Sequence, residues 1–272
     1  MTSQRMLIAL DIDGTILDWA GRIPDETFAE VSRLQASGHE VMLATGRSHS
    51  DTLPVRERLA IEPNYVVSAN GAMTLKRGDD GEYRPHWVET FDPTDTLLSL
   101  RSGLKGANFA VEGADGVFRY SGSFPEGSFE AQGMQVEFDD LLHQQVTRMV
   151  VVSLDQSTEE FLAQVEEVGL HSVSYSVGWT AWLDIAPFGV NKGTALERVR
   201  QDLGFAREDV FVAGDGRNDI EMLEWAKNGG GRAIVMGGSP QEVIDAGNEI
   251  TDDFEHDGLP NKLATIPSYS GA

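Results

Sequence analysis

The chain has 272 residues, enough for one large domain or two smaller ones, and its formal net charge is −23 because 44 acidic residues face 21 Lys and Arg. A field of this sign repels the phosphates of polynucleotides and anionic lipids, so no nucleic-acid partner is expected. Cysteine is absent, which excludes disulfides and thiolate chemistry. Because neither a signal-peptide pattern nor an apolar run of membrane-spanning length is present, we expect a cytoplasmic protein with no membrane role.

The first predicted strand, residues 6–11, is followed by two acidic residues at its carboxyl end. Asp11 and Asp13 come directly after a branched apolar run, and Gly14-Thr15 predicts the turn that ends it. Because side chains alternate along a strand, both carboxylates share one face at the edge where open α/β sheets bind ligands. Crowding two anions there costs free energy unless a cation or a proton compensates, which favours a chemical role for the pair.

A helix over about 24–37 leads to a second strand, Glu40 to Ala44, which ends at Thr45-Gly46-Arg47. The threonine hydroxyl, a backbone N–H and the guanidinium can bind an oxyanion, although the same residues could form an ordinary strand-ending turn. A second helical stretch and a third strand, Tyr65 to Ser68, follow. Strands that alternate with helices predict a parallel, right-handed βαβ sheet.

The pattern changes after the charged stretch at 76–81, which we interpret as a linker. Residues 83–186 contain short strands and two predicted helices, at about 93–104 and 157–168, which indicates a separate α+β domain. The βαβ alternation resumes at residue 192 and continues to about residue 246. We therefore expect one discontinuous α/β core with helices on both faces of a parallel sheet, built from residues 1–82 and 187–272, with residues 83–186 inserted.

Two further clusters carry polar chemistry in the second part of the core. Asn191-Lys192-Gly193 places a lysine at a helix start, where its charge adds to the positive end of the helix dipole. Gly214 to Asp219 follows another predicted strand and adds carboxylates and an amide. Oxygen ligands without Cys or His nearby suit Mg²⁺. Each cluster alone could be a turn, a cap or a solvated lysine, but their order along one sheet favours a common site.

Together these motifs resemble the haloacid dehalogenase superfamily of phosphohydrolases, specifically its Cof-like branch. The matching segments are Asp11-Ile-Asp-Gly-Thr15, Ala44-Thr-Gly-Arg47, Ser68-Ala-Asn-Gly-Ala72, Asn191-Lys-Gly-Thr194, Gly214-Asp-Gly-Arg-Asn-Asp219 and Asp257-Gly-Leu259. The resemblance implies a Rossmann-like core, dependence on Mg²⁺, phosphoryl transfer through an aspartyl-phosphate, and a large cap formed by the inserted residues. The glycine-rich stretch Gly229–Gly231 is longer than the usual family spacing and is expected only to lengthen a loop.

The resemblance also implies a role for each matching residue. Asp11 would be the nucleophile and a metal ligand, and Asp13 the general acid/base, with its backbone carbonyl on the metal. Asp215 would be the carboxylate metal ligand, and Asp219 would orient Lys192 or a metal-bound water. The residues expected at the phosphoryl group are Thr45, Gly46, Arg47, Lys192 and Asn218.

Within the inserted domain, Trp179 and Trp182 flank a strand that returns to the core, and Asp184 shares a face with Trp182. They could contact a sugar ring, or the tryptophans could pack the interior of the cap. We expect a Mg²⁺-dependent phosphatase acting on a small phosphorylated metabolite, with sugar phosphates the leading class. A phosphomutase or phosphotransferase using the same aspartyl-phosphate and a non-enzymatic phospho-acceptor are the alternatives, and the oligomeric state is left open.

Overall fold

The computed structural model describes residues 4–18, 20–125, 128, 133–169, 173–177 and 181–269. The chain forms two compact units. The core unit comprises Met1–His86 and Asn191–Ala272, and the cap unit comprises Trp87–Val190. Both boundaries lie four residues beyond the limits expected from the sequence, 82/83 and 186/187.

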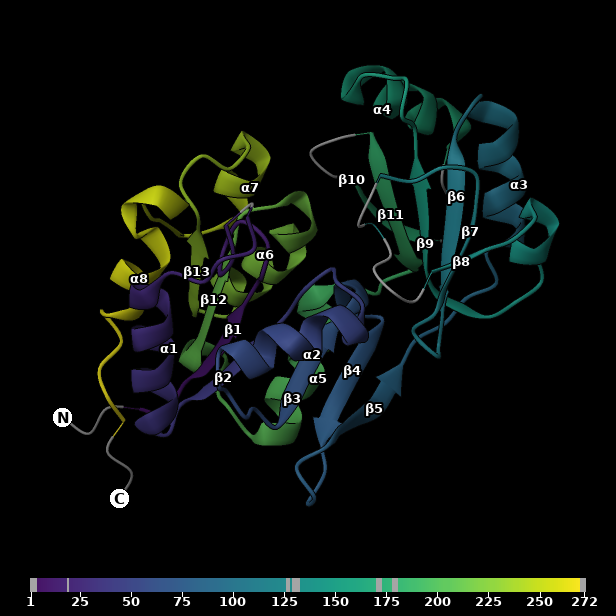
Figure 1. The fold of residues 1–272 in the computed structure, drawn as a ribbon. Helices are drawn as coiled ribbons and strands as arrows, with labels where there is room; N and C mark the ends of the chain where they lie inside the picture. The colour runs from purple at the N-terminus through teal and green to yellow at the C-terminus, as the bar shows by residue number, and fades with distance from the viewer. Residues whose placement is uncertain are drawn as a thin grey trace. The chain divides into compact units, whose positions relative to one another are not determined.

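A five-stranded parallel sheet in the order β14-β13-β12-β1-β2 forms the centre of the core unit (Figure 1). Strand β1, Leu7–Leu10, lies between its two parallel neighbours and is fully buried, as expected for a parallel strand covered on both faces. Because Leu10 pairs with both Leu43 and Ala213, the carboxyl ends of β1 and its two neighbours reach the same edge of the sheet. The other strands are β2 (Glu40–Leu43), β12 (Val210–Gly214), β13 (Arg232–Val235) and β14 (Glu249–Ile250).

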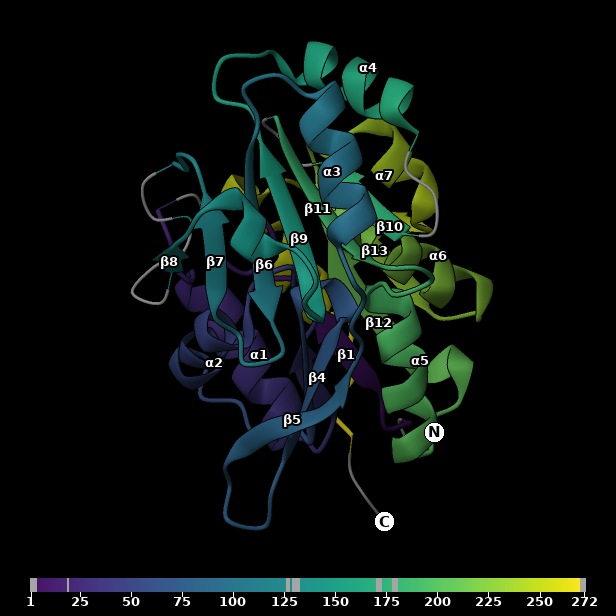
Figure 2. The ribbon, with the colours of Figure 1, turned by 90° about the vertical axis from the view of Figure 1, so that its right-hand side faces the viewer.

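Helices cover both faces of this sheet, which confirms the predicted α/β architecture. Helices α1 and α8 lie side by side on one face, and α5, α6 and α7 form a row on the other (Figures 1 and 2). The helices of the core unit are α1 (Asp25–Ala36), α2 (His49–Arg58), α5 (Lys192–Leu203), α6 (Ile220–Asn228), α7 (Gln241–Ala246) and α8 (Gly258–Leu263).

The third predicted strand forms where expected and meets β2 in parallel at one bridge, but its expected place in the main parallel sheet was wrong. Strand β3, Tyr65–Ser68, pairs antiparallel with β4, Met73–Arg77, in a three-stranded sheet completed by β5, Tyr83–Val88. Its link to β2 is an isolated bridge between Ala44 and Val67. A left-handed turn directly after β3 reverses the chain, so β4 returns alongside it. The charged stretch at 76–81 is accordingly the end of β4 and a hairpin turn, and not a linker.

The cap unit is a six-stranded, mainly antiparallel sheet in the order β10-β11-β9-β6-β7-β8. Helices α3 (Thr94–Gly103) and α4 (Thr158–Val168) pack against one face through an apolar cluster that includes Leu183 and Ile185. Because side chains alternate, Trp182 and Asp184 point to the opposite face. The strands are β6 (Asn108–Gly113), β7 (Phe118–Ser121), β8 (Gly133–Gln135), β9 (Val146–Val152), β10 (Val173–Val177) and β11 (Trp182–Pro187).

The glycine-rich stretch Gly229–Gly231 ends α6. Gly230 has a φ of +82°, and the amide of Gly231 donates to Ala226 O at 2.9 Å. A Cβ at Gly231 would lie 2.7 Å from Val210 O, so only glycine lets the chain pass the start of β12 this closely. The stretch therefore has a packing role. Among the described residues, every helix is too short or too polar to cross a bilayer.

Candidate active site

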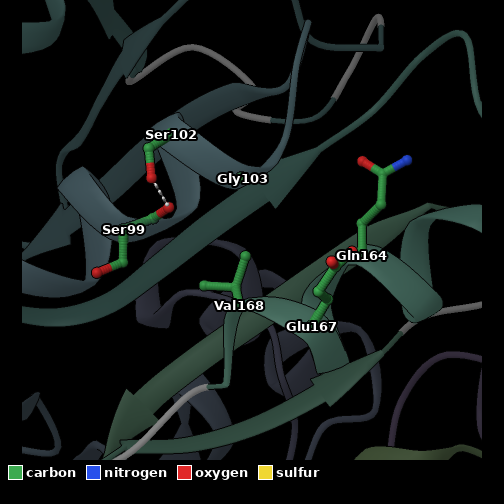
Figure 3. Close-up of a pocket in the computed structure, with 6 residues that line it drawn as sticks. All are labelled: Ser99, Ser102, Gly103, Gln164, Glu167 and Val168. Carbon is green, nitrogen blue, oxygen red and sulfur yellow. Dashed lines mark hydrogen bonds between the residues drawn. The ribbon is translucent and has the colours of Figure 1, made fainter.

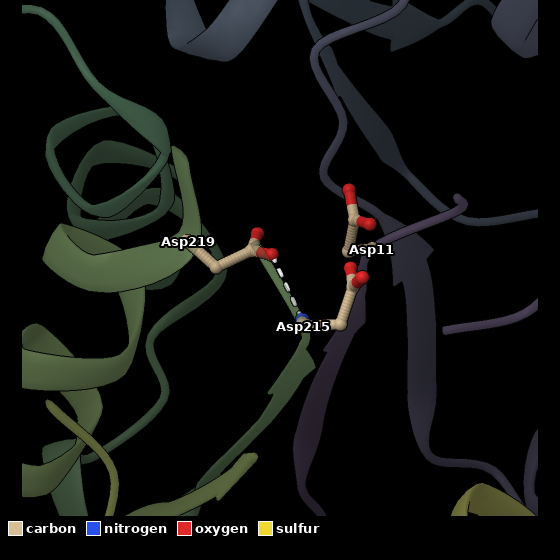
Figure 4. A group of neighbouring side chains, drawn as sticks. All are labelled: Asp11, Asp215 and Asp219. Atoms are coloured by element: carbon tan, nitrogen blue, oxygen red, sulfur yellow. Dashed lines mark hydrogen bonds between the residues drawn. The ribbon is translucent and has the colours of Figure 1, made fainter. Parts of the chain in front are cut away.

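Three carboxylates from two segments of the core unit converge at the carboxyl edge of its sheet. Asp11 follows β1 and Asp215 follows β12, while Asp219 precedes α6. One oxygen from each lies within 4.8 Å of the others, and all three residues are at least largely buried (Figure 4). A Cβ on Gly14, whose φ is +76°, would lie 2.2 Å from Asp215 Oδ2, so the Gly14 turn can pack directly against this carboxylate.

Lys192 is the cation of this cluster. It occupies the first turn of α5, whose start is capped by the Asn191 side chain accepting from Thr194 N at 2.8 Å. Its Nζ donates at 2.6 Å to both Asp11 Oδ1 and Asp219 Oδ1, and the residue has no exposed surface. Burial by itself lowers the pKa of Lys192, but the two carboxylates raise it above its ordinary value, so the ammonium stays charged. The alternative of a solvated surface lysine is excluded.

Asp219 is occupied on both oxygens. Oδ1 accepts from Lys192, and Oδ2 accepts from the amides of Asp215 at 3.1 Å and Gly216 at 3.0 Å. The dashed line in Figure 4 marks the bond to Asp215. These three bonds tie the Asp219 carboxylate to the Lys192 ammonium and to the loop after β12.

The cluster carries excess negative charge, since three carboxylates face one ammonium. Burial, then the Asp219 charge, raises the pKa of Asp11 to about 7. Burial, then the Asp11 charge, raises the pKa of Asp215 to about 8. Both shifts report that a further positive charge at this position would be favourable. Carboxylate oxygens without sulfur or imidazole ligands fit a hard divalent cation such as Mg²⁺.

The loop after β2 brings a hydroxyl and a guanidinium to the same edge. Thr45 is buried. Its backbone amide donates a hydrogen bond to Val67 O at 3.0 Å, and its Oγ1 accepts one from Arg47 N at 3.1 Å. The Arg47 guanidinium forms a bidentate, fork-like pair of hydrogen bonds with the Asp13 carboxylate, from Nε to Oδ2 at 2.8 Å and from Nη2 to Oδ1 at 2.6 Å. A guanidinium has five N–H donors, so three remain beyond this pair. Arg47 thus has a partner that the sequence analysis did not predict.

Asn218 and Gly46 meet at a residue absent from the predicted site, Asn70. Asn218 Nδ2 donates to Asn70 Oδ1 at 3.1 Å, and a Cβ on Gly46 would lie 3.0 Å from the same oxygen. The signal that could have identified Asn70 is its place in Ser68-Ala-Asn-Gly-Ala72, where Asn-Gly favours a left-handed turn.

In the cap unit, Trp182 Nε1 donates a hydrogen bond to Asp184 Oδ2 at 3.0 Å. Asp184 also accepts from Arg148 Nη1 at 3.4 Å, and the Trp182 ring packs edge-on against Phe124. They therefore form part of a polar and aromatic network on the sheet face opposite the helices. Trp179 lies outside the described residues.

A cavity of about 440 Å³ lies elsewhere in the cap unit, between α3 and α4 (Figure 3). The Ser102 hydroxyl in its wall donates to the carbonyl of Ser99 at 2.8 Å, and Val168 approaches Gly103 closely. None of the predicted site residues lines it; the lining residues are Ser99, Ser102, Gly103, Gln164, Glu167 and Val168.

Comparisons with known proteins agree with this arrangement. A family model described as haloacid dehalogenase-like hydrolase matches residues 8–263. The 5-amino-6-(5-phospho-D-ribitylamino)uracil phosphatase YitU of Bacillus subtilis (strain 168) is 27% identical over 269 residues, covering 97% of this chain and 98% of the relative. The pyridoxal phosphate phosphatase YbhA of Escherichia coli (strain K12) is 26% identical over 277 residues, covering 93% and 95%.

The fold is shared with solved structures of the same superfamily. The subclass IIB sugar phosphatase BT4131 superposes with a TM-score of 0.79 at 19% identity, covering 95% of this chain and 98% of that one. A structure from work on the conservation of a trigonal-bipyramidal intermediate in a phosphoryl-transfer superfamily superposes with a TM-score of 0.80 at 18% identity, covering 96% of this chain and 98% of that one. The chain therefore belongs to the haloacid dehalogenase-like hydrolases, as a phosphatase of phosphoric monoesters with an inserted cap.

Proposed function

We propose that this protein is a Mg²⁺-dependent phosphatase that hydrolyses a small phosphomonoester through an aspartyl-phosphate (an acyl phosphate) formed at Asp11. The observation that carries the proposal is the buried Lys192 ammonium held between Asp11 and Asp219, beside the carboxylate of Asp215. A carboxylate can attack phosphorus only where positive charge offsets its repulsion from the phosphoryl oxygens. Lys192, which has no exposed surface, supplies such charge.

In the first half-reaction, an Asp11 oxygen attacks phosphorus and the bond to the leaving alcohol breaks. Lys192 and the Thr45 hydroxyl stabilise the phosphoryl oxygens, and Asp13 gives its proton to the departing alkoxide. In the second, Asp13 takes a proton from water, the water oxygen bonds to phosphorus, and the bond to Asp11 breaks. Inorganic phosphate leaves, and both carboxyl groups return to their starting forms.

The donor set supports a divalent cation in this site. Asp11 and Asp215 would hold it through their carboxylates, and Asp13 through its backbone carbonyl. When bound, Mg²⁺ supplies the positive charge that Lys192 alone does not provide. Asp219 keeps Lys192 in place through its hydrogen bond at 2.6 Å, and Arg47 holds the carboxylate of Asp13.

For the substrate, we propose a small phosphorylated metabolite of the sugar-phosphate class. Support comes from the relatives, whose names include a phosphoribitylamino-uracil phosphatase and a pyridoxal phosphate phosphatase. The network of Trp182, Asp184 and Arg148 on the cap sheet offers an aromatic ring and charged groups for an organic leaving group.

A panel of phosphorylated metabolites with Mg²⁺ tests the proposal, with phosphate release measured for the wild type, Asp11→Asn and Asp13→Ala. We expect release by the wild type, and folded variants that have lost turnover. Full activity in Asp11→Asn would contradict the covalent route. Formation of an isomeric sugar phosphate without phosphate release would indicate a mutase, and a long-lived phosphoprotein would indicate a phospho-acceptor.

A further inference from the structure

The turn after β3 has an unusual backbone. Three consecutive residues have positive φ: Ala69 at 49°, Asn70 at 51° and Gly71 at 98°. The left-handed conformation is unfavourable for residues with a Cβ, although asparagine tolerates it better than most. Two such residues in sequence persist only where their surroundings hold them, and strain of this kind concentrates at functional sites.

Two segments of the candidate site flank this turn. Ala69 N donates to Arg47 O at 2.8 Å, and Asn70 N donates to Thr45 O at 3.0 Å, so the turn holds the backbone of the expected phosphate loop. On its other side, a Cβ at Gly71 would lie 2.3 Å from the carbonyl oxygen of Asn191, the residue before Lys192. The turn therefore packs tightly between the loop after β2 and the start of α5.

The Asn70 side chain adds a contact that the backbone conformation does not require. The residue is 9% exposed, and its Oδ1 accepts from Asn218 Nδ2 at 3.1 Å, which links two segments 148 positions apart. Gly46 packs against the same oxygen. Asn218 Nδ2 has a second N–H, which this bond leaves available. The orientation of the Asn218 amide is thus set by Asn70.

We propose that Asn70 is a positioning residue for phosphoryl binding. Its side-chain carbonyl fixes the Asn218 amide so that the second N–H of Asn218 serves the phosphoryl oxygens, while its backbone amide steadies Thr45. The inference rests on the proposed function, because it takes Asn218 and Thr45 to be phosphoryl ligands. If the position required only a left-handed backbone, glycine would serve equally well.

The test uses inorganic phosphate as the probe, with its dissociation constant measured by calorimetry in the presence of Mg²⁺. Asn70→Gly keeps the backbone conformation accessible and removes the side chain with its amide, so the fold is expected to survive. We expect phosphate affinity to fall about fivefold to tenfold, the usual value of one hydrogen bond. The matched control is Ala60→Gly, which relaxes a left-handed residue at φ 52° after α2, outside the site, and is expected to leave the affinity unchanged.

A double-mutant cycle separates positioning from a general loosening of the loop. In an Asn218→Ala background, Asn70→Gly should weaken phosphate binding no further, because the group through which it acts is gone. Independent, additive losses would overturn the proposed route. Equal affinity of wild type and Asn70→Gly would overturn the inference alone, whereas a wild type that fails to bind phosphate would overturn the proposed function with it.

Discussion

Replacement of Lys192 by methionine tests the electrostatics of the site without an assumed substrate. Methionine keeps an unbranched apolar chain of similar length but has no charge. The variant leaves Asp11 and Asp219, both buried, without the ammonium that now lies 2.6 Å from each. Removing one partner of a buried ion pair costs about 3–5 kcal/mol, because the remaining charge is uncompensated. We expect a loss of this size in the free energy of unfolding of the metal-free protein.

The loss can be measured by thermal unfolding followed by circular dichroism in a chelating buffer. For a protein of this size, each kcal/mol shifts the midpoint by about 2–4 °C, so the expected decrease is about 6–20 °C. The control is Lys76→Met: Lys76 pairs with Asp202 at 3.5 Å, and both side chains are more than two-fifths exposed. That pair is screened by water, so its loss should leave the midpoint nearly unchanged. Equal midpoints for Lys192→Met and wild type would refute the reasoning.

Three further predictions concern the metal, the acid and the C-terminal part of the core. Mg²⁺ should raise the unfolding midpoint of the wild type but not that of Asp215→Asn, because a cation that binds the folded state stabilises it; equal shifts in both would argue against this ligand. Arg47→Ala should lower the turnover of an alkyl phosphate more than that of 4-nitrophenyl phosphate, because nitrophenolate is a good leaving group and needs little help from Asp13. Arg47→Lys should not restore the turnover, because an ammonium cannot donate to both oxygens of Asp13 in the way the guanidinium does. Measuring kcat for both substrates checks this prediction. The Arg232 guanidinium lowers the pKa of Glu249 from 4.5 to about 2, so this carboxylate contributes stability that is fully present above pH 4.5 and is lost as the pH falls through about 2. The difference in unfolding free energy between wild type and Glu249→Gln should therefore shrink on acidification, and a constant difference would count against the ion pair.

The sheet and its polar edge were predictable because both depend on patterns local to each strand. Apolar runs located β1, β2 and β12, and parallel pairing brings their carboxyl ends to one edge whatever the connecting segments do. The residues that follow those ends, Asp11, Thr45 and Asp215, therefore had to lie near one another. The haloacid dehalogenase resemblance then gave each of them an expected role.

Side-chain partners were not predictable in the same way, because they depend on tertiary distances of a few ångströms. Arg47 was expected to bind phosphate, and nothing in its sequence neighbourhood indicates that its fork reaches Asp13. Asn70 finds its partner 148 positions away. The antiparallel pairing of β3 with β4 was not predicted, because the Tyr65–Ser68 run has the same composition as a parallel strand and the Asn70-Gly71 turn signal does not show which strand will pair next.

The central strand of the core sheet has a consequence for how the enzyme is made. One neighbour of β1 is β2, but the other is β12, which begins about 200 residues later. At about 5–20 residues per second, a ribosome needs roughly 10–40 s to deliver that neighbour after Asp11 has emerged. Throughout this interval the nascent chain has Asp11 but lacks Asp215, so the buried carboxylate cluster cannot assemble until residue 215 has been made.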